Sequence, residues 1–382
     1  MAKFLVIHPN MDIYGGGERV CHHILKTLVA NGQQVELLTF DFNRSLYREI
    51  MGETLPEEII VHNLGNRAEV EAKQPLSVYK RRRNILGMLK KYTERATYDY
   101  TFSTQTISAF ETALFKKAKK NITYVHFPEI HYDYEHSKRS KRIYLWLYKK
   151  FIEKDIGKLD LVFCNSNYTK TMTEKYWGKF GIENPIVAYP PVEERFWSIK
   201  PLNDRPKRAL YVGRFVVQKR HELMKKLAVE FPQFEFMSVG LLRDSEKSWF
   251  AEFTKDMPSN YAVKPNLPEE EVIQLFQTSQ IYCHLMEGEH FGIAPMEALA
   301  SGCVTLVHNS GGSGEFVPPE FRWDTFEDLK SKMAKLIDAP RPFAFWNKKK
   351  DELLERISVL QPKKFEDQIW SHLETLMQKT EK

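Results

Sequence analysis

Two glutamates stand on either side of a Phe-Gly step in the stretch MEGEHFGIAPMEALASG, residues 286–302. Pro295 suits the first position of a helix and Gly302 is placed to end it, so Glu297 is expected in the first turn and Glu289 in the loop before it. A carboxylate can accept hydrogen bonds from two neighbouring hydroxyls, such as those of a sugar ring or a ribose. Glu289 and Glu297 are therefore predicted to bind hydroxyl groups, while the loop amides ahead of the helix face an anion.

Glu297 also has a purely structural interpretation. A glutamate in the first turn can complete a capping box with a serine or threonine at the start of the helix. Ala294 occupies the position where that partner is expected. The residue types therefore favour ligand binding over capping.

A cationic turn follows a strand-like run in LYVGRFVVQKRH, residues 210–221. The run ends at Val212, a glycine follows, and Arg214 and Lys219 stand five positions apart around the entry to a helix. A planar guanidinium, a compact ammonium and the positive end of a helix together suit a diphosphate. The alternative is two solvated side chains, and the position directly after a buried strand favours the diphosphate site.

The segment YVHFPEIHYDYEH, residues 124–136, places His126 at the carboxyl end of a predicted strand, where it could hydrogen-bond a substrate hydroxyl. His131, Asp133 and Glu135 follow at every second position, and a strand would place all three on one face as metal ligands. For His131, Asp133 and Glu135, a polar loop is the favoured interpretation.

Three consecutive glycines occur in HPNMDIYGGGERV, residues 8–20, just before a helical pattern. Gly16 and Gly17 lack side chains, so a phosphate or a sugar could approach the backbone closely. Val20 stands where a dinucleotide fingerprint needs its third glycine, which disfavours NAD binding. A flexible turn at a helix start remains the alternative.

The elements that must position these residues alternate along the chain. Short β-branched and aromatic runs alternate with helical patterns in both halves, which predicts parallel sheets covered by helices. The predicted strands are KFLVIH, QVELLTF, ITYVHF, LDLVFCNS, RALYVGRF, FEFMSVG, QIYCHLM and CVTLVHN. The fold class is thus α/β, with two facing Rossmann-like domains and an interdomain cleft.

The domain boundary is predicted in a proline-rich connection, residues 189–207. We expect an N-terminal domain over residues 1–195 and a C-terminal domain over residues 196–362. Residues 363–382 are predicted to form a helix that packs back on the N-terminal domain.

Composition narrows the class of protein. The 382 residues suit two domains, and no run of eighteen apolar residues or signal-peptide-like segment occurs, which predicts a cytoplasmic protein. The four cysteines are far apart and are expected to be buried and free. Residues 1–200 hold 31 Lys and Arg against 23 Asp and Glu, which predicts an anionic partner for this half. A nucleic acid is disfavoured because no known binding module is present.

These motifs resemble those of a retaining glycosyltransferase of the GT-B architecture, in the large family 4. The glutamate pair around FG with a following EALASG, the GRFVVQK turn and His126 carry the resemblance, which covers nearly the whole chain. Finer stretches are similar to the mannosyltransferases that extend lipid-linked oligosaccharides with α1,2-mannose. They are HPNMDIYGGGERV, YVHFPEI, CNSNYTKTM, YPPVEERFW, EHFGI and HNSGG.

The resemblance implies roles for particular residues. Arg214 and Lys219 would bind the donor diphosphate, Glu297 the ribose and Glu289 the hydroxyls of the donor sugar. His126 would lie near the reacting carbon. Donor-binding positions would also include Gly16, Gly17, His290, Phe291, Gly292 and Ile293.

The resemblance also implies the reaction and its partners. A hexose, with mannose favoured, would pass from a nucleotide sugar, with GDP-mannose favoured, to a glycan or a polyprenyl-linked glycan acceptor. The family uses neither a metal ion nor another cofactor. The alternatives are a UDP-sugar-dependent family 4 transferase with another acceptor, and a nucleotide-sugar epimerase on the same scaffold.

Two basic and aromatic segments suit an anionic membrane surface, residues 79–92 and residues 137–152. The alternative for each is an amphipathic helix that packs on its own domain with a solvated basic face. The first interpretation predicts peripheral attachment to the cytoplasmic face of a membrane.

Overall fold

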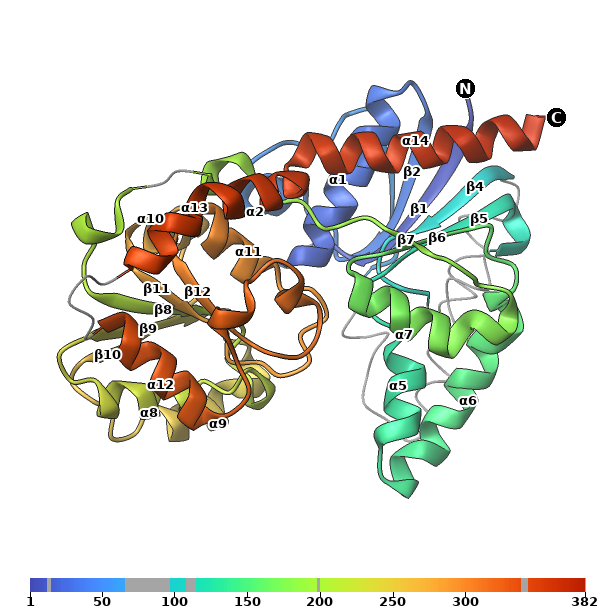
Figure 1. Ribbon diagram of the computed structural model, residues 1–382. Helices are drawn as coiled ribbons and strands as arrows, with labels where there is room; N and C mark the ends of the chain where they lie inside the picture. The colour runs from blue at the N-terminus through green and yellow to red at the C-terminus, as the bar shows by residue number, and fades with distance from the viewer. Residues whose placement is uncertain (12–14, 66–96, 108–114, 198–199, 338–342, 382) are drawn as a thin grey trace. The chain divides into compact units, whose positions relative to one another are not determined.

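The computed structural model describes residues 1–11, 15–65, 97–107, 115–197, 200–337 and 343–381 (Figure 1). The chain divides into two compact units, as the alternation of strands and helices predicts. Unit 1 comprises Met1–Pro191 and Lys363–Lys382, and unit 2 comprises Val192–Pro362.

Unit 1 contains a seven-stranded parallel sheet in the order β3-β2-β1-β4-β5-β6-β7. The strands are β1 (Lys3–Asn10), β2 (Gln34–Phe40), β3 (Ile60–Asn63), β4 (Tyr98–Ser103), β5 (Ala118–Val125), β6 (Leu161–Cys164) and β7 (Ile186–Val187). The helices are α1 (Gly16–Ala30), α2 (Arg44–Met51), α5 (Glu129–His136), α6 (Arg139–Ile156), α7 (Asn167–Trp177) and α14 (Pro362–Glu381). The near-continuous apolar runs of β1 and β2 are typical of parallel strands buried on both faces.

The C-terminal helix α14 belongs to unit 1, although it follows unit 2 in the sequence. Phe365, Ile369 and Leu373 recur every four residues, so they lie on one face of the helix, and all three are buried in the core that α1 also lines. Glu366 hydrogen-bonds His23 of α1 at 2.9 Å. Figure 1 shows α14 running across unit 1 beside α1.

Unit 2 contains a six-stranded parallel sheet in the order β10-β9-β8-β11-β12-β13. The strands are β8 (Arg208–Val212), β9 (Glu235–Gly240), β10 (Tyr261–Pro265), β11 (Ile281–Cys283), β12 (Val304–His308) and β13 (Arg322–Trp323). The helices are α8 (Glu222–Glu230), α9 (Lys247–Phe253), α10 (Glu269–Thr278), α11 (Ile293–Ala300), α12 (Phe326–Ile337) and α13 (Ala344–Ile357).

Both sheets have the strand order of the doubly wound Rossmann fold, in which the order reverses beside the first strand. In unit 1 the reversal lies between β1 and β4, and in unit 2 it lies between β8 and β11. Ligands of such sheets bind at the carboxyl ends of the strands that flank this point. The loops after these strands are therefore the first places to look for a site.

The four cysteines are buried and free, which confirms that prediction. Within the described residues, no helix is both long enough and apolar enough to cross a membrane.

Candidate functional site

The candidate site of unit 2 lies at its switch point. Arg214 and Lys219 follow β8, whereas His284 and Glu289 follow β11. These two strands are hydrogen-bonded neighbours, with Ile281 opposite Ala209. Parallel strands present their carboxyl ends at one edge, so two loops that are about seventy residues apart in sequence meet there.

Lys219 and Glu289 form an ion pair at this edge. The Lys219 Nζ lies 2.8 Å from Glu289 Oε2, and the exposed fractions of the two side chains are 18% and 15%. Burial raises the pKa of the Glu289 carboxyl, but the Lys219 ammonium and the His284 imidazole outweigh burial and hold that pKa well below its usual range. Glu289 is therefore a carboxylate at neutral pH.

His284 is a candidate site residue that the motif analysis missed. Its Nε2 lies 3.2 Å from Glu289 Oε2, and because a carboxylate only accepts, Nε2 carries the hydrogen. Burial lowers the pKa of His284, so the ring is neutral and Nδ1 is unprotonated. Nδ1 is buried and has no hydrogen-bond partner among the described residues. The available signal was its position directly after a strand, the same signal that selected His126.

The loop that carries Glu289 is held through its backbone. Glu289 pairs with Gly311 in an isolated parallel bridge, and Gly312 N–H donates to the Glu289 carbonyl at 2.7 Å. Gly288 N–H donates to Ser310 Oγ at 2.8 Å. Gly311 has a φ of +80°, and a Cβ there would lie 2.1 Å from the Glu289 carbonyl oxygen. The loop after β12 thus fixes the carboxylate, and only glycine fits at the contact.

Lys219 is held from the other side by the core of unit 2. It ends the 3₁₀ turn Val217–Lys219, and its carbonyl accepts a hydrogen bond of 2.7 Å from the buried Tyr211 hydroxyl. Its Nζ also lies 3.0 Å from Met286 Sδ. The backbone of Lys219 is therefore held by Tyr211 of β8, and its ammonium has two side-chain neighbours from the loop after β11.

Arg214 lies directly beyond β8 and is exposed. Its carbonyl accepts a hydrogen bond of 3.0 Å from His221 Nε2. Burial lowers the pKa of His221 to about 4, so this ring is a neutral donor that shapes the turn. The guanidinium is positioned at the same switch point as Lys219, but no contact joins these two side chains in the described part of the chain.

The second glutamate lies deeper in its helix than predicted. The helix α11 begins at Ile293, so Pro295 is its third residue and not its first, and Glu297 lies beyond the first turn. The N-cap is Gly292, whose φ of +86° is a backbone conformation that glycine adopts without strain. The helix can therefore begin at Ile293, before the proline. Glu297 is 7% exposed, and Gly302 closes the helix with a φ of +76°, as predicted.

The remaining predicted donor positions lie in the turn between Glu289 and α11. His290 is half-buried, and burial lowers its pKa. Phe291 is 2% exposed and packs edge-to-face on Phe316 at 6.2 Å. Gly292 and Ile293 form the start of α11. Phe291 therefore anchors the turn in the core.

In unit 1, His126 directly follows β5 at the edge where β1 and β4 also end. Its Nε2 lies 3.1 Å from the Thr104 carbonyl, and its backbone N–H donates to Thr106 Oγ1 at 2.9 Å. A Cβ on Gly17 would lie 3.6 Å from His126 Nε2. The fold thus brings His126 and the glycine turn together, although they are over one hundred residues apart.

The glycine turn begins α1, which starts at Gly16. Gly15 is its N-cap, and a Cβ there would lie 2.5 Å from Glu18 Oε2. Glu18 is buried, and its Oε1 lies 3.8 Å from the buried His8 Nε2. A side chain at position 15 would therefore require the Glu18 carboxylate to move, whereas the extended backbone of Gly15, with a φ of −160°, is open to any residue.

Neither prediction for His131, Asp133 and Glu135 is correct, because these residues belong to helix α5. Helical positions two apart point about 200° from one another, so the three side chains share no face. Among the described residues, no three His, Cys, Asp or Glu side chains form a group that could hold a metal ion.

The comparisons with known proteins agree with this geometry. Residues 14–194 match the family model described as Glycosyltransferase Family 4, and residues 193–340 match the model described as Glycosyl transferases group 1. The doubly wound units and these matches define a glycosyltransferase of the GT-B fold. The chain therefore carries a Glycosyltransferase Family 4 domain followed by a Glycosyl transferases group 1 domain.

Curated relatives and solved structures extend the comparison. The chain is 26% identical over 247 residues to the GDP-Man:Man(3)GlcNAc(2)-PP-Dol alpha-1,2-mannosyltransferase of Neurospora crassa, with 54% of this chain and 44% of that protein covered. It is 28% identical over 192 residues to the human protein of the same name, with 45% of this chain and 38% of that protein covered. The matched part thus spans less than half of either relative.

Among solved structures, sucrose-phosphate synthase from Thermosynechococcus elongatus has a TM-score of 0.77 at 14% identity and covers 99% of both chains. HepE of Anabaena, solved with UDP and glucose, has a TM-score of 0.71 at 14% identity and covers 98% of this chain and 100% of its own. These likenesses confirm the fold.

Gly311→Ala tests the loop contact, with Gly288→Ala as the matched control. Both glycines have positive φ, +80° and +64°, but a Cβ on Gly288 would meet nothing within 4 Å. We expect Gly288→Ala to lower the free energy of unfolding by about 1 kcal/mol through backbone strain alone. Gly311→Ala should cost at least about 2 kcal/mol more, because the Glu289 carbonyl must move. Urea denaturation measures both, and equal losses would show that the contact does not hold the loop.

Proposed function

We propose that this chain is a retaining glycosyltransferase that moves mannose from GDP-mannose to a glycan carried on a lipid diphosphate. The observation that carries the proposal is the Lys219–Glu289 pair at the switch point of unit 2, within the group 1 glycosyl transferase domain. The names of the curated relatives favour GDP-mannose as the donor and a dolichol-diphosphate glycan as the acceptor class.

In the proposed reaction, the bond between the anomeric carbon and the diphosphate oxygen breaks, and negative charge develops on the nucleoside diphosphate. Lys219 and Arg214 would stabilise that charge from positions set before the reaction begins. An ammonium has three N–H donors. Glu289 and the weak acceptor Met286 Sδ use two of them, so a phosphate oxygen can take a third.

Glu289 would orient the donor sugar. Its carboxylate has about four acceptor sites, of which Lys219 and His284 use part, and the remainder can accept from two sugar hydroxyls. Because Lys219 and His284 keep it ionised, it would remain an acceptor throughout the reaction. Glu297 would hold the ribose, and His290, Phe291, Gly292 and Ile293 would complete the donor-binding turn.

Retention of configuration would follow if the acceptor hydroxyl attacks from the side of the leaving group and passes its proton to a phosphate oxygen. The anomeric carbon then forms its new bond to the acceptor oxygen as its bond to the diphosphate breaks. His126, fixed by Thr104 and Thr106, would lie against the transferred sugar, and the turn of Gly16 and Gly17 would let the substrates approach the backbone.

A donor panel tests the proposal. The full chain is incubated with GDP-mannose or UDP-glucose, with and without a lipid-diphosphate oligosaccharide. We expect α-linked mannose transfer from GDP-mannose only when the acceptor is present, at an unchanged rate in EDTA. Conversion of the donor sugar without an acceptor would instead indicate an epimerase, and activity lost in EDTA and restored by Mn²⁺ would contradict the proposed charge stabilisation.

Removal of either cation should slow transfer. We expect Lys219→Ala and Arg214→Ala to lower kcat/KM by about 100-fold to 1,000-fold, because each loses one donor to the developing anion. Lys226→Ala removes an exposed lysine on α8 and should retain the rate of the full chain. Circular dichroism checks folding, and Arg214 is exposed, so its loss leaves no buried charge unpaired. Turnover near that of Lys226→Ala in both variants would remove the diphosphate assignment.

We further propose that helix α6 contacts an anionic membrane. One side of α6 packs on unit 1, as in an amphipathic surface helix, through the buried residues Leu145, Ile152 and Ile156. The same helix also exposes three large apolar side chains, Ile143, Tyr144 and Trp146. Lys141 and Lys150 of the same helix are also exposed, and a mixture of exposed basic and apolar side chains is typical of interfacial helices. The other segment, residues 79–92, lies outside the described residues.

Ile143→Ser tests the membrane surface against a matched control. Ile143 is 68% exposed, and Val229 on α8 is 67% exposed. We expect Ile143→Ser to weaken binding to phosphatidylserine vesicles about tenfold, because an inserted isoleucine contributes apolar burial. Val229→Ser should have no effect, and high salt should weaken binding by every variant. Co-sedimentation measures this, and equal binding by the two variants would exclude α6 as the contact.

A further inference from the structure

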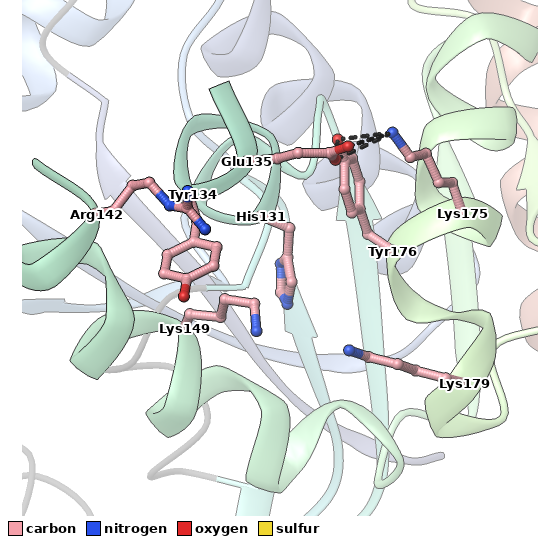
Figure 2. Close-up of a pocket in the computed structure, with 8 residues that line it drawn as sticks. All are labelled: His131, Tyr134, Glu135, Arg142, Lys149, Lys175, Tyr176 and Lys179. Atoms are coloured by element: carbon pink, nitrogen blue, oxygen red, sulfur yellow. Dashed lines mark hydrogen bonds and ion pairs between the residues drawn. The ribbon is translucent and has the colours of Figure 1, made fainter. Parts of the chain in front are cut away.

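A cavity lies in unit 1, and none of its lining residues is among those assigned above to donor binding. Helices α5, α6 and α7, with the 3₁₀ turn Gly178–Phe180 after α7, surround a space of about 400 Å³ (Figure 2). That volume is within the range of small-molecule sites. Its lining contains four cationic side chains, one from each of Arg142, Lys149, Lys175 and Lys179.

His131 presents an unused hydrogen-bond donor to this cavity. The side chain is 3% exposed, and the indole N–H of Trp177 lies 3.2 Å from its Nδ1. An indole N–H only donates, so Nδ1 accepts and Nε2 must carry the hydrogen. Nε2 has no hydrogen-bond partner among the described residues, and the nearest carboxylate oxygen, on Glu153, is 3.9 Å away. Burial lowers the pKa of His131 to about 4, which agrees with a neutral ring.

Three of the cations stand around this donor. Figure 2 shows the imidazole of His131 directed between Lys149 and Lys179, with Arg142 farther along the same wall. Lys149 lies 2.7 Å and Lys179 lies 3.5 Å from Glu153 Oε1, so the two lysines share one carboxylate. The ammonium groups therefore keep N–H donors for another acceptor.

Arg142 is paired with no carboxylate in the described part of the chain. Its guanidinium lies over the ring of Tyr134 at 5.0 Å, and Lys149 lies over the same ring at 4.9 Å. This stacking fixes the guanidinium while its N–H edge stays available.

The opposite wall is already neutralised. Glu135 accepts from Lys175 at 3.0 Å and from the Tyr176 hydroxyl at 2.5 Å. Both carboxylates at the cavity thus lie within ion-pair distance of lysines, and the buried His131 Nε2–H has cations around it and no hydrogen-bond partner among the described residues. Such a surface suits an anion with several oxygens, and it repels a metal cation.

We propose that this cavity binds a phosphoryl group of a small molecule or of a lipid head group. A phosphate offers enough oxygens to accept from His131 Nε2, from the Arg142 fork and from Lys149 and Lys179 together. The proposal stands on unit 1 alone and does not depend on the donor site proposed for unit 2.

The test uses inorganic phosphate with the full chain and follows the proton–nitrogen NMR signal of His131 Nε2–H, assigned through its loss in His131→Gln. We expect phosphate to shift this signal saturably. Arg142→Gln with Lys179→Gln should weaken the response about tenfold or more, because two charge-assisted contacts are lost. Arg139→Gln with Lys154→Gln removes the same charge from exposed positions of α6 outside the cavity and should respond as the full chain does.

A shift that persists in Lys219→Ala would confirm that the response comes from unit 1 and not from the candidate donor site. No saturable shift in the full chain, or equal affinity in the cavity and control variants, would overturn the proposal.

Vesicles that contain phosphatidic acid separate the two sources of the phosphoryl group. If the head group is the ligand, the cavity variant should bind these vesicles more weakly than the control variant. Equal binding of vesicles by the two variants, together with the expected shift by inorganic phosphate, would identify a free phosphorylated molecule as the ligand.

Discussion

The ion pair between Lys219 and Glu289 is the contact on which the proposed donor site depends. Two charges that are largely withdrawn from water are unfavourable unless their remaining hydrogen-bonding capacity is satisfied. Here His284 donates to the carboxylate, Tyr211 holds the lysine backbone, and the bridge to Gly311 fixes the glutamate loop. The ion pair is therefore held by residues on β8 and in the loops after β8, β11 and β12. The parallel sheet sets the distance between these loops.

The two units use a similar device at their strand ends. In each, a histidine directly after a strand is bonded to a group at the same end of the sheet: His126 to the Thr104 carbonyl, which follows β4 in unit 1, and His284 to Glu289 of its own loop in unit 2. A histidine at a strand end is rigid when one ring nitrogen is bonded to a fixed group. That rigidity suits a side chain that must contact a sugar in one orientation. It also explains why a doubly wound sheet can position such side chains with short loops.

Much of the fold and part of the site could be predicted because they depend on local patterns. Strand runs, glycine turns and the GRFVVQK segment were recognisable, and Arg214, Lys219 and Glu289 do follow the two central strands of unit 2. The α5 helix was predicted as a loop because its alternating aromatic and acidic residues, near His131, carry no helical period. The start of α11 was placed at Pro295 because proline favours the first position of a helix. The helix begins two residues earlier, because Gly292 is its N-cap. The basic cavity is assembled from three helices, so no single segment could have indicated it.

The central claim is that two fixed cations in the turn after β8, Arg214 and Lys219, receive the diphosphate of the donor. A crystal structure of the full chain with GDP, grown without divalent ions, tests it most directly. We predict diphosphate oxygens within hydrogen-bond distance of Lys219 Nζ and of the Arg214 guanidinium, with the Lys219–Glu289 contact retained. A diphosphate bound away from both side chains, or one that enters this site only with a divalent ion, would contradict the claim.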